Sequence, residues 1–435
     1  MWKQLVTFLL IGYLCMGRSF AYWGIPPWHL FIGEGALFLF LFFGPFVGGE
    51  RFLWLALRQP VLRRFKKAFV VFLVFGIFEV IRGAISGNPL MFALRDLSMH
   101  YYPLYFFMGM WVALHDDRYL PNFFRLVAWV NGIYGILFIL LLSRVSWSFS
   151  GFSDNTLPVQ IFGQPSYSAL ILLGLLVFEK DLRRIWPLLA LNSFVLLGML
   201  IRAEWLAFGM GLLVWAWASR NFKRVAWGGA LVLSLIFLMY ITNFSFQAPE
   251  TRGGTISATD MIGRVLAPIN ADAASDYTSD THMYEGNVVW RTIFWLQIWD
   301  NVHETKMRTL LGFGYGYPIN ELVPNLEEEA TRTPHNVFFY VLAYTGWMGV
   351  AIFAAFQWEL LRLFREVRQE TGEPFGMVFF VAMIAFALFT PFFETPQGAI
   401  PFYLLAGGIC ASLFYAPAEL PVAVRPLVPA NQEGS

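Results

Sequence analysis

The chain has 435 residues, of which 57% are hydrophobic and only 14% are charged, and its mean hydropathy is +0.57. Soluble domains carry about 25% charged residues, so this composition excludes an ordinary soluble domain and indicates a lipid-embedded protein. The net charge of +1 argues against a polyanionic partner, and no nucleic-acid partner is expected. Cys15 and Cys410 lie in apolar runs, which argues against a disulfide framework or a cysteine metal site.

The distribution of apolar segments predicts an all-α, polytopic membrane protein with about twelve transmembrane helices, since a spanning helix needs about 20 residues and can be shorter inside a bundle. The N-terminal stretch "MWKQLVTFLLIGYLCMGRS" resembles a signal peptide, but the many later spans favour an uncleaved first helix. The predicted spans are 4–17, 28–48, 68–82, 98–114, 122–142, 166–179, 185–201, 204–219, 225–242, 336–357, 375–392 and 398–415.

Three regions follow from this division of the chain. Residues 1–242 form a predicted N-terminal membrane bundle of about nine spans. Residues 243–335 form a large loop before the tenth helix, and residues 336–435 form a C-terminal bundle of about three spans with a tail.

The positions of the basic residues predict the orientation, because Lys and Arg favour cytoplasmic loops. With the N-terminus inside, the inner side holds 19 of the 30 Lys and Arg residues, and the short outer loops hold only 5. Both termini are therefore expected on the cytoplasmic side. The inner loops include 49–67 and 358–374, and the large loop is expected on the outer side.

The large loop is far longer than an ordinary connection, which is typical of a functional segment. It begins with a Thr-, Ser- and Asp-rich part and continues with "VVWRTIFWLQIWDNV" (288–302), which we expect to be a helix. It then contains "LLGFGYGYP" (310–318), a glycine turn, and an acidic stretch. We expect the partly helical loop to cap the bundle.

A histidine stands where this loop meets the tenth predicted span, in "TRTPHNVFFYVLAYTGWMG". We expect Thr333 to be the N-cap, Pro334 to be the first helical residue, and His335 and Asn336 to lie in the first turn. Such a helix start attracts anions and disfavours a protonated imidazole, so a neutral histidine there suits a general base. The alternative is an interfacial histidine that only caps the helix.

Two arginines are candidate partners of this histidine. Arg202 lies at the outer hairpin in "GMLIRAEWLAFGMG", where an ionisable residue at membrane depth suggests function. The alternative is an ion pair with Glu204 that completes the hairpin. Arg291 shares a helical face with Trp295, four residues later. Its alternative is an interfacial aromatic helix with a single basic residue.

Arg95, in "ALRDLSMHYYPLY", and Arg332, three residues before His335, are weaker candidates. Several arginines would nevertheless gather with one histidine on the outer side of an apolar protein. Guanidinium groups bind phosphates in bidentate fashion and keep their charge. A lipid-linked diphosphate would therefore suit this set of residues.

Other polar signals are less specific. The glycine turn follows no strand and has no Walker lysine, so we interpret it as a turn and not as a nucleotide site. Asp116 and Asp117 could bind Mg²⁺ on the inner side, but an isolated pair is typical of a solvated loop. Glu34 and Glu79 lie in spans and are either relay groups or hydrogen-bonded contacts in the bundle. We predict no cofactor and no metal ion.

At this point the pattern resembles a known family. In "HNVFFYVLAYTGWMG" a His-Asn pair, nine residues and Gly-x-x-Gly follow one another, which is similar to the signature of O-antigen ligases and related lipid-linked polysaccharide polymerases. "WRTIFWLQIWDN…LLGFGYGYP" and "LIRAEWLAFGMGLLVW" are similar to the family's Arg-x-x-x-Trp helix with its glycine turn and to its arginine hairpin. The likeness is loose over the whole topology and more specific over residues 190–360.

The resemblance implies an inverting, metal-independent glycosyltransferase at the periplasmic face of the bacterial inner membrane. Its donor would be a glycan on undecaprenyl diphosphate. Arg202 and Arg291 would bind the diphosphate, and His335 would activate the acceptor hydroxyl or orient the phosphate. Arg332, Asn336 and Arg95 are further expected diphosphate contacts.

This chain departs from the family hairpin, which usually reads Ser-Arg-Gly, because Ile201 and Ala203 flank Arg202 here. The residues around Arg202 therefore match the family pattern less closely than the residues around His335 do. The acceptor would be a lipid A core sugar or another protein for a ligase, and a second lipid-linked repeat for a polymerase. The sequence does not decide between the two, and we adopt the ligase-like label. The alternative is a twelve-span transporter or flippase, although matching halves with broken helices are not evident.

Overall fold

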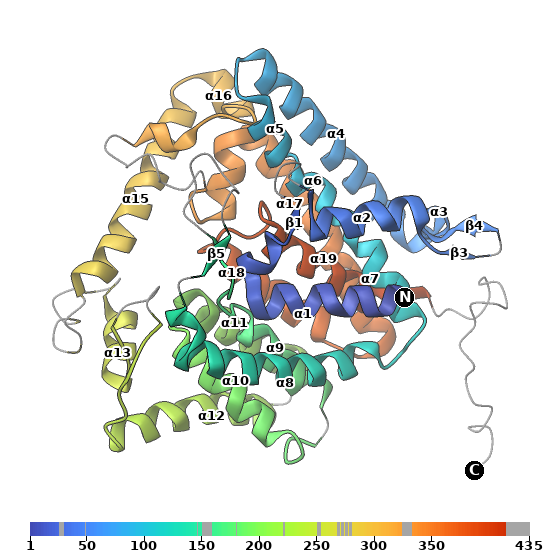
Figure 1. Cartoon of the computed structure of the whole chain (residues 1–435). Helices are drawn as coiled ribbons and strands as arrows, with labels where there is room; N and C mark the ends of the chain where they lie inside the picture. Colours follow the sequence, from blue (N-terminus) through green and yellow to red (C-terminus); the bar gives the residue numbers. More distant parts are fainter. Residues whose placement is uncertain are drawn as a thin grey trace, which may run out of the picture.

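The computed structural model describes residues 1–25, 30–47, 49–145, 147–149, 159–179, 181–220, 222–249, 254–267, 270, 274, 277, 281–323 and 333–414. These residues are mostly helical (Figure 1). The α-helices are α1 (Trp2–Ala21), α2 (Ile32–Phe43), α3 (Phe52–Arg58), α4 (Arg63–Ile85), α5 (Leu90–Asp96), α6 (Ser98–Tyr101), α7 (Tyr105–Leu114), α8 (Tyr119–Leu140), α9 (Ser168–Phe178), α10 (Trp186–Gly198), α11 (Arg202–Ser219), α12 (Phe222–Ile241), α13 (Ala258–Leu266), α15 (Thr281–His303), α16 (Lys306–Leu311), α17 (Val337–Thr371), α18 (Phe375–Ala387) and α19 (Pro396–Cys410).

The remaining regular elements are short. Five 3₁₀ helices lie in the described part: η2 (Pro60–Leu62), η3 (Tyr102–Leu104), η4 (Leu142–Arg144), η5 (Ile319–Leu322) and η6 (Ala411–Phe414). Four antiparallel ladders pair β1 (Gly24–Ile25) with β2 (Leu30–Phe31), β3 (Phe46–Val47) with β4 (Glu50–Arg51), β5 (Ser148–Phe149) with β6 (Val159–Gln160), and β7 (Phe246–Gln247) with β8 (Thr255–Ile256). Each closes a connection between helices.

Five helical segments of the described chain are long and apolar enough to cross a membrane: Trp2–Ala21, Pro60–Ile85, Tyr119–Leu140, Val337–Thr371 and Pro396–Phe414. Shorter apolar helices cover Ile32–Phe43, Ser168–Phe178, Trp186–Gly198, Val225–Ile241 and Phe375–Ala387. Every predicted span overlaps a helix. The mostly helical, membrane-type fold is therefore confirmed, while the number of crossings, about twelve, stays a prediction.

Two predicted boundaries are wrong. The span predicted at 98–114 is divided into α6, η3 and α7, because Pro103 within η3 has no backbone N–H for a continuous helix. The inner loop predicted at 358–374 is helical as far as Thr371. There Arg362 pairs with Glu359 and Glu366 of the same helix, and such neighbours one turn apart stabilise it.

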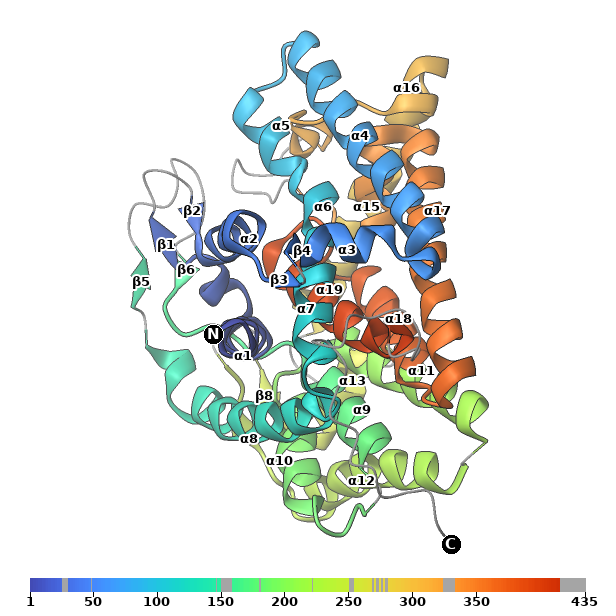
Figure 2. The ribbon, with the colours of Figure 1, turned by 90° about the vertical axis from the view of Figure 1, so that its right-hand side faces the viewer.

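The helices pack around one large hydrophobic cluster. Within it α7 lies against α19, α11 against α18, and α4 against α17. Figure 2 shows α17 running most of the height of the molecule, from the level of α16 and α4 to that of α11. Helix α15 packs on the beginning of α17 and α13 packs on α15 (Figure 1), so the helix predicted at 288–302 is present and covers the start of α17.

Candidate active site

The candidate site is built around the start of α17. The helix begins at Val337, and its N-cap is Asn336, whose Oδ1 accepts hydrogen bonds from the N–H groups of Phe338 (2.9 Å) and Phe339 (3.3 Å). The prediction that Thr333 caps the helix and that His335 lies in its first turn is therefore wrong. Asparagine is among the strongest N-cap residues, and here it caps the helix three residues later than threonine would.

His335 stands directly before this cap, with a left-handed backbone (φ 54°). Its Nδ1 lies 3.2 Å from the carbonyl oxygen of Thr333. Because a carbonyl oxygen can only accept, we assign the proton to Nδ1, which leaves Nε2 with a lone pair. The ring also meets Trp290 edge-on, with 5.6 Å between centroids.

The imidazole is held in its neutral form. Burial, and then the positive charge of Arg291, lower the pKa of His335 from 6.5 to about 4. A neutral imidazole with an available Nε2 can take up a proton from a hydroxyl. Burial and the nearby cation thus both favour the neutral histidine that the sequence led us to expect.

Arg291 lies on α15, half-buried, with one amino group donating to the carbonyl oxygen of Phe389 (3.2 Å). Its Nε is buried and has no hydrogen-bond partner among the described residues. Burial, and then the charge of Arg202, lower the pKa of Arg291. Arg202 and Arg291 are therefore close enough to repel each other.

Trp295 fixes α15 against the loop that carries the histidine. Its indole N–H donates to the carbonyl oxygen of Pro334 (2.8 Å), and its ring stacks on Phe339 with 5.4 Å between centroids. Arg291 and Trp295 are four residues apart and share a face of the helix. The Arg-x-x-x-Trp pattern thus presents the cation and anchors the helix beside His335.

Arg202 is the first residue of α11, directly after its N-cap Ile201. One amino group donates to the carbonyl oxygen of Arg264 (3.2 Å) in α13. Arg264 is itself buried in an ion pair with Asp260. Glu204 is buried and accepts the N–H of Ala169 at the start of α9 (3.2 Å), so its carboxylate supports the neighbouring helix.

The structure thus places Arg291 within electrostatic range of both Arg202 and His335, while Asn336 and Arg95 have other surroundings. The side-chain oxygen of Asn336 is used for the helix cap. Arg95 is exposed in the last turn of α5. Arg332 lies outside the described residues.

One further buried ionisable residue was not predicted. Glu394 is buried in the connection between α18 and α19, where its Oε2 accepts the N–H of Phe392 (3.0 Å). Its Oε1 has no partner among the described residues. Burial is the main cause that raises the pKa of Glu394 to about 7, and Asp96 adds to it. A glutamate between two apolar segments, in "TPFFETPQG", was the available signal.

The two glutamates predicted within spans are both hydrogen-bonded. The hydroxyl of Tyr102 donates to Glu34 (3.3 Å), and Glu79 forms an ion pair with Arg82 (2.6 Å). The described residues contain no group of three or more His, Cys, Asp or Glu side chains placed to hold a metal ion.

The apolar helices indicate a multi-pass membrane protein, and Arg291 lies within electrostatic range of both Arg202 and His335. Residues 187–354 match the family model described as O-antigen ligase. This confirms the resemblance to an O-antigen ligase-like family and supports a ligase- or polymerase-like function in bacterial polysaccharide biosynthesis. No curated protein matches the chain. The matched segment contains Arg202, Arg291 and His335.

Proposed function

We propose that the protein transfers a glycan from undecaprenyl diphosphate to an acceptor hydroxyl at the periplasmic face of the inner membrane. The observation that carries the proposal is the half-buried Arg291 guanidinium, whose Nε has no hydrogen-bond partner among the described residues and whose charge acts on both Arg202 and the imidazole of His335. This combination suits a reaction in which a diphosphate leaves while a hydroxyl loses its proton.

In the proposed reaction the acceptor oxygen attacks the anomeric carbon of the first sugar. The bond from that carbon to the diphosphate oxygen breaks, and its electron pair stays with the leaving diphosphate. Nε2 of His335 receives the hydroxyl proton. A single displacement of this kind inverts the anomeric configuration, and the arginines neutralise the charge that grows on the diphosphate.

No step in this scheme needs a metal ion, because fixed guanidinium groups supply the positive charge that Mg²⁺ provides in many diphosphate reactions. The twelve-span layout with regions 1–242, 243–335 and 336–435, with both termini in the cytoplasm, belongs to the same proposal. A ligase and a polymerase would share this donor chemistry. We favour the ligase, with a lipid A core sugar or another molecule as acceptor.

The test uses purified protein in liposomes with a glycan on undecaprenyl diphosphate and a candidate acceptor. We expect His335→Ala to lower kcat by about 10²- to 10⁴-fold and Arg291→Ala by about 10²- to 10³-fold. Arg202→Ala should also lower kcat. Arg58→Ala is the matched control, since Arg58 pairs with Glu50 in an exposed ion pair away from these residues. Normal transfer by all three site variants would refute the proposal.

The same assay tests the finer points. Activity that disappears with a chelator would contradict the metal-independent scheme, and retained anomeric configuration in the product would contradict a single displacement. Competition between a lipid A core acceptor and a second lipid-linked repeat distinguishes ligation from polymerisation. Movement of the intact donor across the bilayer without transfer would instead support the alternative, a transporter or flippase.

A further inference from the structure

Helix α17 is interrupted nine residues after its start. Gly346 has φ 61° and ψ −165°, which is not a helical conformation, so the first half-helix (337–345) ends there. Two of its last carbonyl groups are bound by the glycine turn: the N–H of Phe313 donates to Ala343 (2.8 Å), and the N–H of Gly314 donates to Tyr344 (2.9 Å). The hydrogen bonds that these carbonyl groups would lack at the break are thus supplied by another part of the chain.

The two backbones touch at this point. A Cβ at Gly346 would lie 2.5 Å from the carbonyl carbon of Leu310, and a Cβ at Gly312 would lie 2.5 Å from the carbonyl oxygen of Ala343. Both glycines also have positive φ angles. Only glycine allows this conformation together with this approach, so the contact is specific to the sequence.

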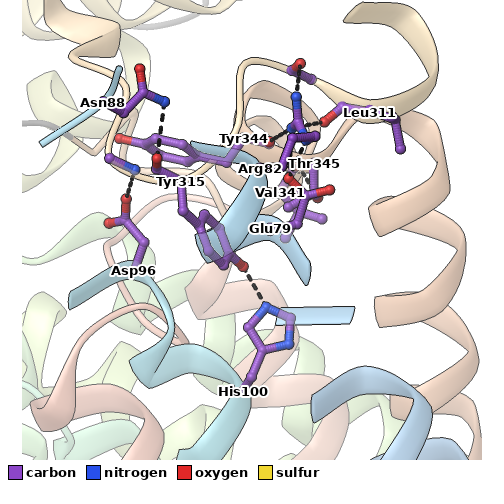
Figure 3. A network of polar contacts seen from close by, with 12 residues as sticks. Glu79, Arg82, Asn88, Asp96, His100, Leu311, Tyr315, Val341, Tyr344 and Thr345 are labelled. Atoms are coloured by element: carbon purple, nitrogen blue, oxygen red, sulfur yellow. Dashed lines mark hydrogen bonds and ion pairs between the residues drawn. The ribbon is translucent and has the colours of Figure 1, made fainter. Parts of the chain in front are cut away.

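The guanidinium of Arg82, on α4, binds both sides of this contact (Figure 3). It donates to the carbonyl oxygen of Tyr344 (3.1 Å) in the first half-helix. It also donates to the carbonyl oxygen of Leu311 and to that of Gly312, which is 3.2 Å away, at the end of α16. Glu79, one turn earlier in α4, accepts a hydrogen bond from Nε of the same guanidinium (2.8 Å). The planar array of five donors makes such multiple bonding possible.

Asp96, on α5, makes a second connection between the same two parts (Figure 3 shows its contact with the turn). Its Oδ2 accepts the N–H of Gly316 (2.8 Å), and its Oδ1 accepts the hydroxyl of Tyr340 (3.1 Å) in the first half-helix. Asn88 and His100 bind the carbonyl and the hydroxyl of Tyr315, in the turn itself.

These contacts join two segments that each carry a site residue. The first half-helix begins two residues after His335, and the glycine turn follows α15 and α16, of which α15 carries Arg291. In each segment, Arg82 binds the end that lies farther from the site residue. The distance between His335 and Arg291 therefore depends on contacts that Arg82 makes from α4.

We propose that Arg82, oriented by Glu79, is a positioning residue of the transfer reaction. It joins the α15–α16 segment to the first half-helix of α17 and so fixes the position of Arg291 relative to His335. The inference rests on the proposed function, and it extends the functional residues to α4, outside the segment that matches the ligase family. Arg82 touches neither substrate nor reacting atoms in this scheme.

The test compares Arg82→Gln and Arg82→Lys with a matched control, Arg362→Gln. Arg362 is also an arginine bonded to a glutamate three residues earlier, but its ion pairs with Glu359 and Glu366 stay within the inner half of α17. Lysine keeps the charge beside Glu79 but lacks the planar fork that reaches several carbonyl oxygens at once. We therefore expect Arg82→Lys to have an effect intermediate between Arg82→Gln and the wild type.

Two measurements do not depend on catalysis. Backbone hydrogen exchange should rise in the glycine turn of Arg82→Gln, because the N–H groups of Phe313 and Gly314 lose stable acceptors. Hydrogen exchange at the imidazole carbon, followed against pH, should show the pKa of His335 rising from about 4 towards 6.5, since Arg291 moves away and water enters. In the third measurement, kcat should fall on the order of 10- to 100-fold, with a smaller change in the KM for the donor.

The outcomes separate the two proposals. Unchanged exchange in the turn and an unchanged His335 pKa in Arg82→Gln would overturn the positioning role, even if the enzyme is active. A wild-type protein without transferase activity would refute the proposed function, while both exchange experiments would still report on the contact. An Arg362→Gln effect equal to that of Arg82→Gln would show a general loss of folding and would also overturn the inference.

Discussion

The indole of Trp295 donates a hydrogen bond to the carbonyl oxygen of Pro334, 2.8 Å away, so α15 is joined to the residue directly before His335. This bond connects the helix that carries Arg291 with the loop that carries the candidate base. The segment that carries Arg291 and the segment that carries His335 are thereby joined at two points. Trp295 joins them near the site, and Arg82 joins them at the break in α17.

Replacing Trp295 by phenylalanine tests the connection at the near end. Trp295→Phe keeps an aromatic ring against Phe339 but loses the hydrogen bond to Pro334, which is worth about 1 kcal/mol. We expect kcat/KM to fall by about fivefold if this energy holds the site geometry. Trp358→Phe, on an exposed part of α17, is the control and should leave kcat/KM unchanged. Equal values for both variants would contradict the assigned role.

The pH dependence of kcat/KM tests the environment of His335. The base must be neutral, and its folded-state pKa of about 4 lies below the usual 6.5, so the acidic limb that belongs to His335 should lie near pH 4 and not near pH 6.5. In Arg291→Ala the positive neighbour is lost, so this limb should move to higher pH. An acidic limb near 6.5 that is still present in Glu394→Gln would contradict the buried, cation-flanked imidazole.

Glu394 adds a second titration to the same profile. Its pKa of about 7 lies well above the ordinary glutamate value, so the buried carboxyl gains its charge as pH rises through neutrality. We expect an inflection near pH 7 in wild-type kcat/KM that is absent in Glu394→Gln. Glutamine preserves an acceptor for the N–H of Phe392, so both proteins should have similar melting temperatures. An inflection that survives in Glu394→Gln must belong to another group.

Asn336 separates helix capping from donor binding. Asn336→Ala should lower the free energy of unfolding by about 1 kcal/mol, because the N–H groups of Phe338 and Phe339 lose their acceptor. Asn336→Asp keeps the cap but places a negative charge beside the cationic site, so it should retain stability and raise the KM for the anionic donor. Thermal unfolding and donor titration measure the two effects. A KM that is unchanged in Asn336→Asp would place the diphosphate elsewhere.

Gly346 should not tolerate a side chain. In Gly346→Ala the new Cβ would meet Leu310 at 2.5 Å and the residue would keep a positive φ, so we expect a loss of more than about 1 kcal/mol of folding stability. Gly209→Ala is the control, because nothing lies within 4 Å of its added Cβ in α11. Its stability should be unchanged or slightly higher, and a tolerated Gly346→Ala would show that the backbone contact is not needed.

Local sequence patterns predicted most of the helices and singled out three candidate site residues. Apolar segments of membrane length located the helices, and Arg202, Arg291 and His335 stood out because each is an ionisable residue beside such a segment. The start of α17 was misplaced because Thr333 and Asn336 are both good caps, and propensity alone does not decide between neighbouring candidates.

Contacts between distant parts of the chain could not be predicted in this way. Arg82 and Gly312 are 230 residues apart, and no periodicity in either segment encodes their meeting. The glycine turn was recognised as a turn, but its fit against the break at Gly346 depends on packing that a single sequence does not reveal. Glu394 was missed for a related reason, since its burial depends on how the connection between α18 and α19 packs.

The break at Gly346 also has an electrostatic consequence. A helix that ends after residue 345 has its own macrodipole, with the negative end at the carbonyl groups near Tyr344 and the positive end at the cap beside His335. Arg82 donates to that negative end and so offsets its partial charge. Under the proposed function, the partial positive charge at the start of the half-helix then acts on the diphosphate with less opposition from the negative end, so an arginine on α4 favours anion binding at the opposite end of the same half-helix.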